Sequence, residues 1–218
     1  DLAQTHLQSR TQLLEDNERL QRENLILQGR SQQMASLQAE NVRLRALLNS
    51  SALLRDDVLV AELVGVSPDP ERLQLVLNKG ESDGVFLGQP LIDADGLMGQ
   101  IVEVSSDSSR ALLITDVTHS VPVQVNRNGV RAIAEGTGEL GSLEIRYVSS
   151  TTDIQPGDLL VTSGLGGRFP EGYPVAVVTD VERDTGEAFA RVRAAPSAAL
   201  DRTRHVLLVF TAPESQEN

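Results

Sequence analysis

A stretch of about 45 residues near the start of the chain sets the strongest limit on the fold. Between residues 5 and 50 there is no proline and a single glycine, Gly29. Apolar side chains recur every seven residues, at Leu13, Leu20, Leu27 and Met34. Asn17 and Asn24 each precede the next leucine by three residues. If the leucines take heptad position d, both asparagines take position a, where asparagine favours a two-stranded parallel coiled coil. At about 1.5 Å per residue, the predicted dimeric rod is roughly 65–70 Å long.

The heptad frame slips after Met34, and the next apolar positions follow a 3–4 spacing that is offset from the first frame. Gly29 lies just before the slip, and a glycine inside a helix costs roughly 1 kcal/mol. We therefore expect a continuous helix that is locally weakened near residues 29–36. The predicted dimer interface comprises Leu13, Asn17, Leu20, Asn24, Leu27, Met34, Leu37, Asn41, Leu44 and Leu48. The alternative interpretation is a single amphipathic helix that lies along the globular part.

From residue 58 onward the sequence has the pattern typical of β-strands joined by turns. Runs rich in Val, Leu and Ile alternate with turn signals, and no run keeps a helical period over ten residues. Asp95-Gly96 and Asn128-Gly129 are hairpin signals between apolar flanks. The predicted strands and hairpins cover residues 58–66, 73–78, 90–104, 121–136, 143–148, 158–163, 173–182, 188–194 and 205–210. Ten to twelve strands are more than one small barrel needs, so we predict a mainly β fold with two barrels after the helix.

The predicted organisation has four segments. Residues 1–57 form the helical coiled coil, 58–118 the first β-barrel domain and 119–212 the second, and residues 213–218 form a disordered tail. The last strand, 205–210, either closes the second barrel or returns to the first.

Charge and composition narrow the class of partner. The net charge is -12, and the first 57 residues hold seven arginines against eight acidic residues, so nearly all the excess lies in the β-rich part. A nucleic-acid surface would be basic, and a base-stacking platform needs aromatic residues, which make up only 3% of the chain. We expect no nucleic-acid partner and interpret the acidity as favouring solubility.

The chain begins inside the helical pattern, at Asp1-Leu2, and contains no run of 18 apolar residues. We therefore expect an N-terminal membrane anchor that is absent from this chain.

We predict no catalytic, cofactor or metal site. Cysteine is absent, and none of the three histidines stands in a nucleophile motif: Ser120 directly follows His119, and no G-x-S-x-G occurs. The stretch DADG (93–96) resembles the start of a calcium loop but lacks the further oxygen ligands, so we interpret it as a turn.

The glycine-rich stretch VTSGLGGRFPEG (161–172) does not have the spacing of a phosphate-binding loop. We predict a connection between two strands, in which glycines supply positive φ. Leu165 and Phe169 are expected to cover the edge of the core.

Seven stretches, in their order and spacing, resemble the MreC family of bacterial rod-shape-determining proteins. They are ENVRLRALL (40–48), VLVAELVGVSPDP (58–70), LVLNKGESDGVFLGQPLIDADGLMGQIVEV (75–104), SSRALLITD (108–116), VPVQVNRNGVRAIAEGTG (121–138), GDLLVTSGLGGRFPEGYPVAVV (157–178) and HVLLVF (205–210). Each motif is weak alone, and the resemblance departs at Ala176, where the family often has glycine.

The resemblance implies a protein on the periplasmic side of the bacterial inner membrane, with a single-pass anchor, a coiled coil and two six-stranded β-barrels. The barrels would be arranged as in chymotrypsin-like proteases, without the catalytic residues. The implied function is a non-catalytic, homodimeric scaffold of the cell-elongation machinery that binds the elongation-specific penicillin-binding transpeptidase and favours its active form. RodA, MreD, the MreB complex and assembly beyond the dimer are also implied.

Two other classes of protein share some of these features. A periplasmic transport adaptor of the membrane-fusion type also joins a coiled coil to β-barrels, but it places an antiparallel helical hairpin inside split β-domains. An active chymotrypsin-like hydrolase would need a Ser-His-Asp triad that this sequence lacks.

Overall fold

The computed structural model describes residues 2–53, 57–67, 72–184 and 186–210. The chain forms two compact units, residues 1–45 and 46–218. The tail predicted at 213–218 lies outside the described residues, and the domain boundaries predicted at 57 and 118 remain predictions.

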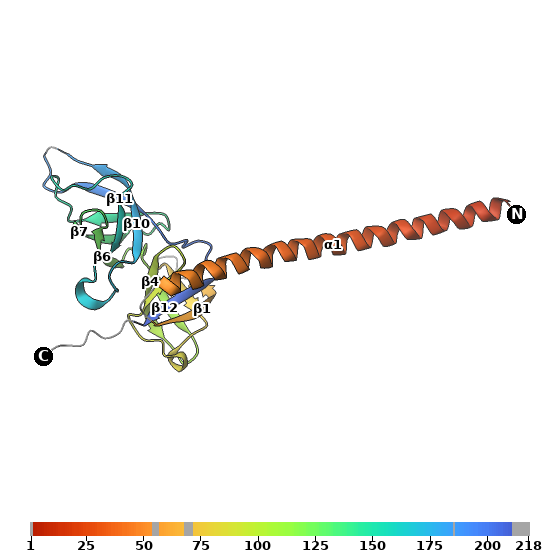
Figure 1. The fold of residues 1–218 in the computed structure, drawn as a ribbon, viewed down its shortest axis with the longest axis horizontal. Helices are drawn as coiled ribbons and strands as arrows, with labels where there is room; N and C mark the ends of the chain where they lie inside the picture. Colours follow the sequence, from red (N-terminus) through yellow and green to blue (C-terminus); the bar gives the residue numbers. More distant parts are fainter. Residues whose placement is uncertain (1, 54–56, 68–71, 185, 211–218) are drawn as a thin grey trace. The chain divides into compact units, whose positions relative to one another are not determined.

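The first unit lies within a single helix, α1 (Leu2–Leu53), which continues through Gly29 without a break (Figure 1). The lack of proline explains the continuity, because proline removes a backbone donor and clashes with the preceding turn. A Cβ at Gly29 would meet no atom within 4 Å, so no close contact requires the glycine. No helix in the part of the chain that the structure describes is long and apolar enough to span a bilayer.

Six antiparallel strands form the first barrel, which is closed. In order around the barrel they are β1 (Asp57–Val66), β12 (His205–Phe210), β3 (Pro90–Ile92), β4 (Leu97–Val104), β5 (Ser109–Leu113) and β2 (Gln74–Leu77), which pairs with β1 again. Inward side chains such as Leu77, Leu91 and Leu207 are fully buried. Leucine, valine and isoleucine thus fill the interior, as expected for a barrel built by an aromatic-poor chain.

The second barrel is also closed and antiparallel. Its strands, in order, are β10 (Pro174–Glu182), β11 (Arg191–Pro196), β8 (Leu143–Arg146), β7 (Arg131–Gly136), β6 (Ser120–Val125) and β9 (Leu159–Thr162). Burial alternates along β6, where Val121, Val123 and Val125 point inward. The sequence prediction of a mainly β fold with two six-stranded barrels is therefore confirmed.

The last strand belongs to the first barrel, not the second. β12 pairs with β1 from Asp57↔Phe210 to Glu62↔His205, so segments from opposite ends of the β-rich part lie side by side (Figure 1). Asp93, in the turn between β3 and β4, holds the segment that leads from β11 back to the first barrel. Its Oδ2 accepts hydrogen bonds from the Ala199 N–H (2.7 Å) and the Thr203 hydroxyl (3.2 Å), both on the connection from β11 to β12.

The connection between the barrels packs tightly against β7. The Gly136 N–H donates a hydrogen bond to the His119 carbonyl (3.2 Å). A Cβ at Gly136 would lie 2.0 Å from the carbonyl oxygen of Asp116, so only glycine fits there.

Two details differ from the sequence predictions. Strand β5 was missing from the predicted ranges, because Ser109 and Arg110 weaken its apolar pattern even though Ser109 is buried. Leu165 lies in a short 3₁₀ turn, η2 (Leu165–Gly167), and is 48% exposed, so it does not cover the core. Phe169 is buried, as predicted.

Candidate functional site

All ten positions of the predicted dimer interface lie in α1. Leu20, Leu27, Met34 and Leu37 are between 56% and 71% exposed, and Asn17, Asn24 and Asn41 are exposed as well. Leu44 is half-buried, whereas the side chains of Leu13 and Leu48 lie outside the described residues. Leu20, Leu27, Met34 and Leu37 thus expose more than half of their surface.

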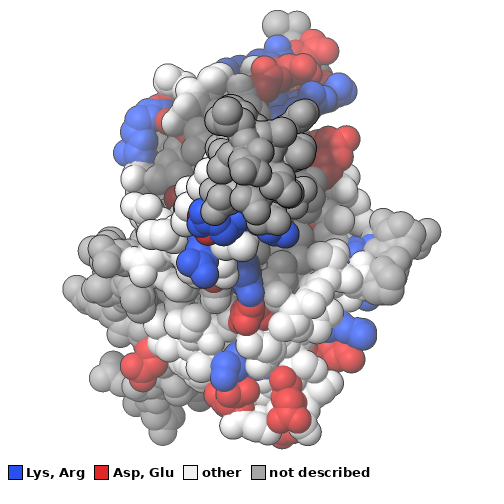
Figure 2. Space-filling model, turned by 90° about the vertical axis from the view of Figure 1, so that its right-hand side faces the viewer, with Lys and Arg blue, Asp and Glu red and all other residues white. Residues whose placement is uncertain are grey.

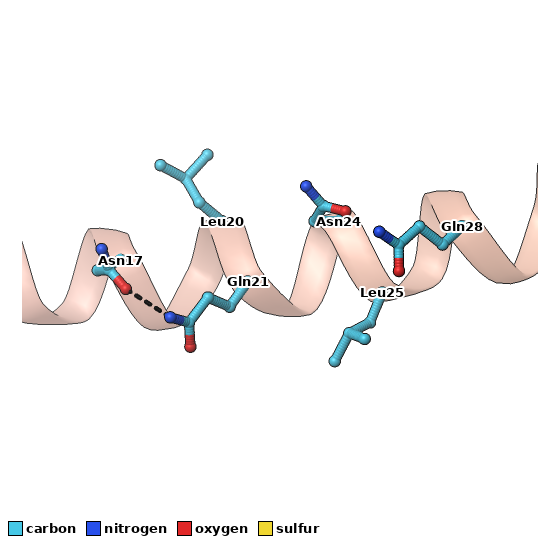
Figure 3. A pocket seen from close by; sticks show the side chains of 6 residues that line it. All are labelled: Asn17, Leu20, Gln21, Asn24, Leu25 and Gln28. Carbon is cyan, nitrogen blue, oxygen red and sulfur yellow. Dashed lines mark hydrogen bonds between the residues drawn. The ribbon is translucent and has the colours of Figure 1, made fainter.

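We call the predicted dimer interface on α1 the seam. Figure 3 shows the part of it around Asn17 and Asn24. A shallow groove is lined by Asn17, Leu20, Gln21, Asn24, Leu25 and Gln28. The Gln21 amide donates a hydrogen bond to Asn17 Oδ1 (2.8 Å) within the same helix. Leu20 and Leu25 point to opposite sides of the helix (Figure 3), so Leu25 lies off the seam although it is also exposed.

The distribution of aromatic side chains in the second unit is unusual. The chain has only four phenylalanines and two tyrosines, and just two of them, Phe169 and Tyr173, are buried. Phe86, Tyr147 and Phe189 are exposed, and Phe210 packs against Phe86 with ring centroids 6.2 Å apart. A chain with few aromatics would normally bury them, because they carry the largest apolar area. Their exposure marks candidate interaction surfaces.

The first surface, which we call the aromatic groove, lies on the second barrel beside the ends of β8 and β11. Tyr147 (70% exposed) and Phe189 (56% exposed) flank it. Arg146, one of its lining residues, pairs with Glu135 (3.0 Å) and Glu144 (3.2 Å). Arg191 and Glu187 are also among the lining residues. The surface therefore combines two aromatic anchors with a rim of paired charges, as protein interfaces do.

Tyr147 is held in a left-handed backbone conformation, with φ of 64°, and is the only described non-glycine residue with positive φ. Such a conformation costs of order 1–3 kcal/mol and often occurs at functional sites. Alternation along β8 would place Tyr147 inward after Leu143 and Ile145. The left-handed turn instead buries Val148 and exposes the tyrosine.

The second surface, which we call the Phe86 groove, has a volume of about 560 Å³. Its walls include Phe86, Leu87 and Val102 of the first barrel and Gly167 and Arg168 of the second. All three apolar side chains are exposed, from 39% to 65%.

Charges of both signs are interspersed on the face drawn in Figure 2, without an extended patch of one sign.

The residues considered for chemistry have structural roles. Asp93 Oδ1 accepts hydrogen bonds from the N–H groups of Asp95 (2.8 Å) and Gly96 (2.9 Å), so DADG is a turn that its own aspartate closes. His119 is 6% exposed, and its ring lies against Phe169 with centroids 6.1 Å apart. Burial lowers the pKa of His119 to about 4; nearby Asp116 opposes this shift and Arg168 adds to it. Within the described ranges, no three His, Asp or Glu side chains gather as metal ligands would.

The dimer seam remains a prediction from the sequence, and sequence reasoning missed both grooves. One signal for Phe189 was available: alternation through the buried Ala190, Val192 and Ala194 puts Phe189 and Arg191 outward. No comparable signal existed for Tyr147, because its exposure follows from its positive φ.

Comparison with known proteins identifies the family. The family model described as "Rod shape-determining protein MreC, barrel core" matches residues 63–210. The "Cell shape-determining protein MreC" of Haemophilus influenzae is 49% identical over 204 residues, which cover 90% of this chain and 58% of that protein. This chain thus spans little more than half of that relative.

Solved structures agree with this match. The crystal structure of MreC from Pseudomonas aeruginosa has 62% identity and a TM-score of 0.69, and covers 71% of this chain and all of that one. A "Complex between Penicillin-Binding Protein (PBP2) and MreC from Helicobacter pylori" contains a chain with 21% identity and a TM-score of 0.53, which covers 72% of this chain and 100% of that one. The latter shows the shared fold alone. The match across the barrel core and the identity to full-length relatives show that the chain belongs to the MreC family of rod shape-determining proteins.

Proposed function

We propose that this chain is the periplasmic part of a non-catalytic scaffold that determines cell shape. In this proposal it pairs with a second copy through α1, binds the elongation-specific penicillin-binding transpeptidase through its barrels and favours the active form of that enzyme. An inner-membrane anchor and contacts with RodA, MreD and the MreB complex belong to the same proposal. The observation that carries it is the exposed apolar seam of α1, together with membership of the MreC family.

The seam supports dimerisation because an isolated amphipathic helix gains stability only by covering its apolar stripe. Leu20 and Leu27 expose more than half of their surface, and burial of a leucine contributes about 1.5–3 kcal/mol. Asn17 and Asn24 at position a would then pair across the interface and set the parallel register. Asn17 would exchange its present hydrogen bond with Gln21 for this contact.

The shift of the heptad frame after Met34 is compatible with a coiled-coil dimer whose supercoil is locally overwound. The step from Met34 to Leu37 inserts three residues into the heptad, and such an insertion locally overwinds a coiled coil. The seam thus continues to Leu44 on a shifted face of the same helix, with no break in α1.

Sedimentation analysis of the whole chain tests the dimer. Leu20→Asp with Leu27→Asp puts two carboxylates into each helix seam and should yield monomers. Leu25→Asp is the matched control, because Leu25 is 68% exposed but lies off the seam. Monomeric wild type, or equal dissociation in the control, would contradict the proposal.

The asparagines have a separate test. Replacing Asn17 and Asn24 by leucine should raise the thermal stability of the helix but produce species larger than dimers, because the polar pair no longer excludes them. Strictly dimeric behaviour of the double variant would count against their assignment to position a.

For the transpeptidase, we infer that the aromatic groove is the docking surface. The Helicobacter pylori complex suggests the class of partner, and Tyr147 and Phe189 are the most exposed aromatic side chains. Tyrosine is enriched among the residues that dominate binding energy at interfaces.

Binding of the purified transpeptidase ectodomain from the same organism, measured by interferometry, tests this assignment. Tyr147→Ala with Phe189→Ala should weaken binding by about 30-fold or more, since loss of an interface anchor costs about 2 kcal/mol or more. Phe86→Ala with Leu87→Ala, on the other groove, is the control and should leave the affinity unchanged. A reversed pattern would move the docking surface to the first barrel, and no binding by the wild type would remove the transpeptidase from the proposal.

A further inference from the structure

A second binding surface is indicated by the Phe86 groove, whose walls are apolar and whose rim carries one cation. Phe86 is 42% and Leu87 65% exposed, and Val102 faces the same space. A volume of about 560 Å³ lies within the range of pockets that hold a small set of side chains or a ligand of drug size.

Contacts within the chain hold several of the residues that line the groove. The Phe86 ring leans on Phe210, and the Phe86 N–H donates a hydrogen bond to Gln89 Oε1 (3.2 Å). Across the floor, Gln100 Nε2 donates a hydrogen bond to the Gly88 carbonyl (2.7 Å). Preformed walls lower the ordering cost that binding must overcome.

Arg168 sets the charge that an occupant must carry. It lies on the rim beside the buried Phe169, which anchors the loop. No ion pair between Arg168 and a carboxylate is found among the residues that the structure describes. An unpaired cation beside an apolar groove favours an occupant that brings apolar side chains and one carboxylate.

The wider charge of the molecule decides between a protein segment and a lipid surface. The β-rich part carries nearly the whole net charge of -12. An anionic bilayer would be repelled by this excess, and a single arginine supplies only about 1 kcal/mol of attraction to it. A short peptide segment contacts only the groove, so its charge needs to match only that of Arg168.

We propose that the Phe86 groove binds a segment of a partner protein that carries two or three apolar side chains next to an aspartate or glutamate. This surface is separate from the aromatic groove, and the proposal does not depend on the transpeptidase.

Phage-displayed random 12-residue peptides, selected on the whole chain, provide the test. Clones that also bind a Phe86→Ser, Leu87→Ser variant are removed, so that only ligands of the groove remain. Both side chains are exposed, and circular dichroism checks that the variant keeps its fold. We expect the recovered peptides to combine apolar residues with Asp or Glu.

A charge-reversal variant completes the test. Arg168→Glu should weaken the best acidic peptide roughly fivefold, because it removes an exposed ion pair and puts a like charge in its place. Selection on this variant should recover peptides with Lys or Arg instead. Recovery of no groove-dependent peptide, recovery of basic peptides by the wild type, or equal affinity for Arg168→Glu would each overturn the proposal. Peptides that match the chain's own sequence would identify a second copy as the occupant and overturn the assignment to a partner protein.

Discussion

Acidification is predicted to destabilise the β-barrels through one buried side chain, His119. Its ring is 6% exposed, and neither ring nitrogen has a hydrogen-bond partner among the described residues. A charged imidazolium in this site would lose its hydration without gaining a hydrogen bond, which is why burial lowers the pKa of His119 from 6.5 to about 4.

The sign and size of the effect follow from this pKa. Above pH 6.5 the histidine is neutral in both the folded and the unfolded chain, and stability is at its full value. Between pH 6.5 and 4 only the unfolded chain takes up the proton, so the free energy of unfolding falls as the pH falls. Each pH unit in this window is worth about 1.4 kcal/mol, which gives a total loss of about 3 kcal/mol.

Carboxylates act at lower pH. Burial raises the pKa of Asp116, but hydrogen bonds from Thr118 and from the Leu73 N–H outweigh this and lower it below 3.8. The pKa of Asp83 is lowered by hydrogen bonds from Lys79 and the Gly80 N–H. Stability that depends on these groups is present above their unfolded pKa and lost below about pH 4. These carboxylates therefore contribute little between pH 6.5 and 4, the window in which His119 acts.

Urea unfolding of the whole chain, followed by circular dichroism at pH 7.5, 6.5, 5.5 and 4.5, measures the slope at one fixed protein concentration. His119→Phe keeps a ring against Phe169 but cannot take up a proton, so its free energy of unfolding should be nearly flat over this window. Any fixed cost of the larger ring displaces the whole curve and leaves the slope unaffected.

An equal loss of stability by wild type and His119→Phe between pH 6.5 and 4.5 would refute the role of His119. So would an NMR titration of the His119 ring in the folded chain that gives a midpoint near 6.5.

Three further predictions concern residues with defined surroundings. Gly29→Ala should stabilise α1 by about 1 kcal/mol, seen as a higher helix melting temperature, because nothing lies within 4 Å of the new Cβ; a lower melting temperature would show that the seam needs the glycine. Gly136→Ala should cost about 3 kcal/mol in urea unfolding, because the Cβ would lie 2.0 Å from a backbone oxygen, whereas the control Gly141→Ala, with open space around it, should stay within about 0.5 kcal/mol. Arg127→Gln removes hydrogen bonds that hold the pKa of Asp158 below its usual value. The free energy of unfolding should then fall at pH 7 and decline less steeply below pH 4, and an unchanged profile would show that this ion pair contributes nothing.

The sequence was sufficient for features that depend on local pattern. A proline-free heptad predicts a helix, and α1 is continuous through Gly29. Asp95-Gly96 and Asn128-Gly129 predict hairpins, and β3–β4 and β6–β7 pair around them. These features need only a few neighbouring residues, whose φ preferences and burial are set by residue type.

Features that depend on contacts between distant residues could not be predicted from the sequence. The place of β12 depends on Asp93, which bonds to Ala199 and Thr203 more than 100 positions away. Exposure of Tyr147 depends on its positive φ, which the residue type does not predict. The burial of His119 depends on Phe169, from a loop 50 residues later. Alternation along the strand gives Phe189 alone, and the two grooves as a whole could not be anticipated, because their walls come from separate strands and loops.

The closure of both barrels limits how the β-rich part can bind another chain. Each strand that the structure describes in the two barrels has a neighbour on both sides, so neither barrel offers an edge strand that a partner could extend along its full length. Binding energy must come from side chains, and four of the six aromatics line or support the two grooves. Pairing through α1 would place two copies of each groove on one assembly. A partner that is itself dimeric or membrane-bound would then gain effective concentration without any new contact. Under these proposals, pairing through α1 would supply multiplicity, and the exposed aromatic side chains would supply affinity.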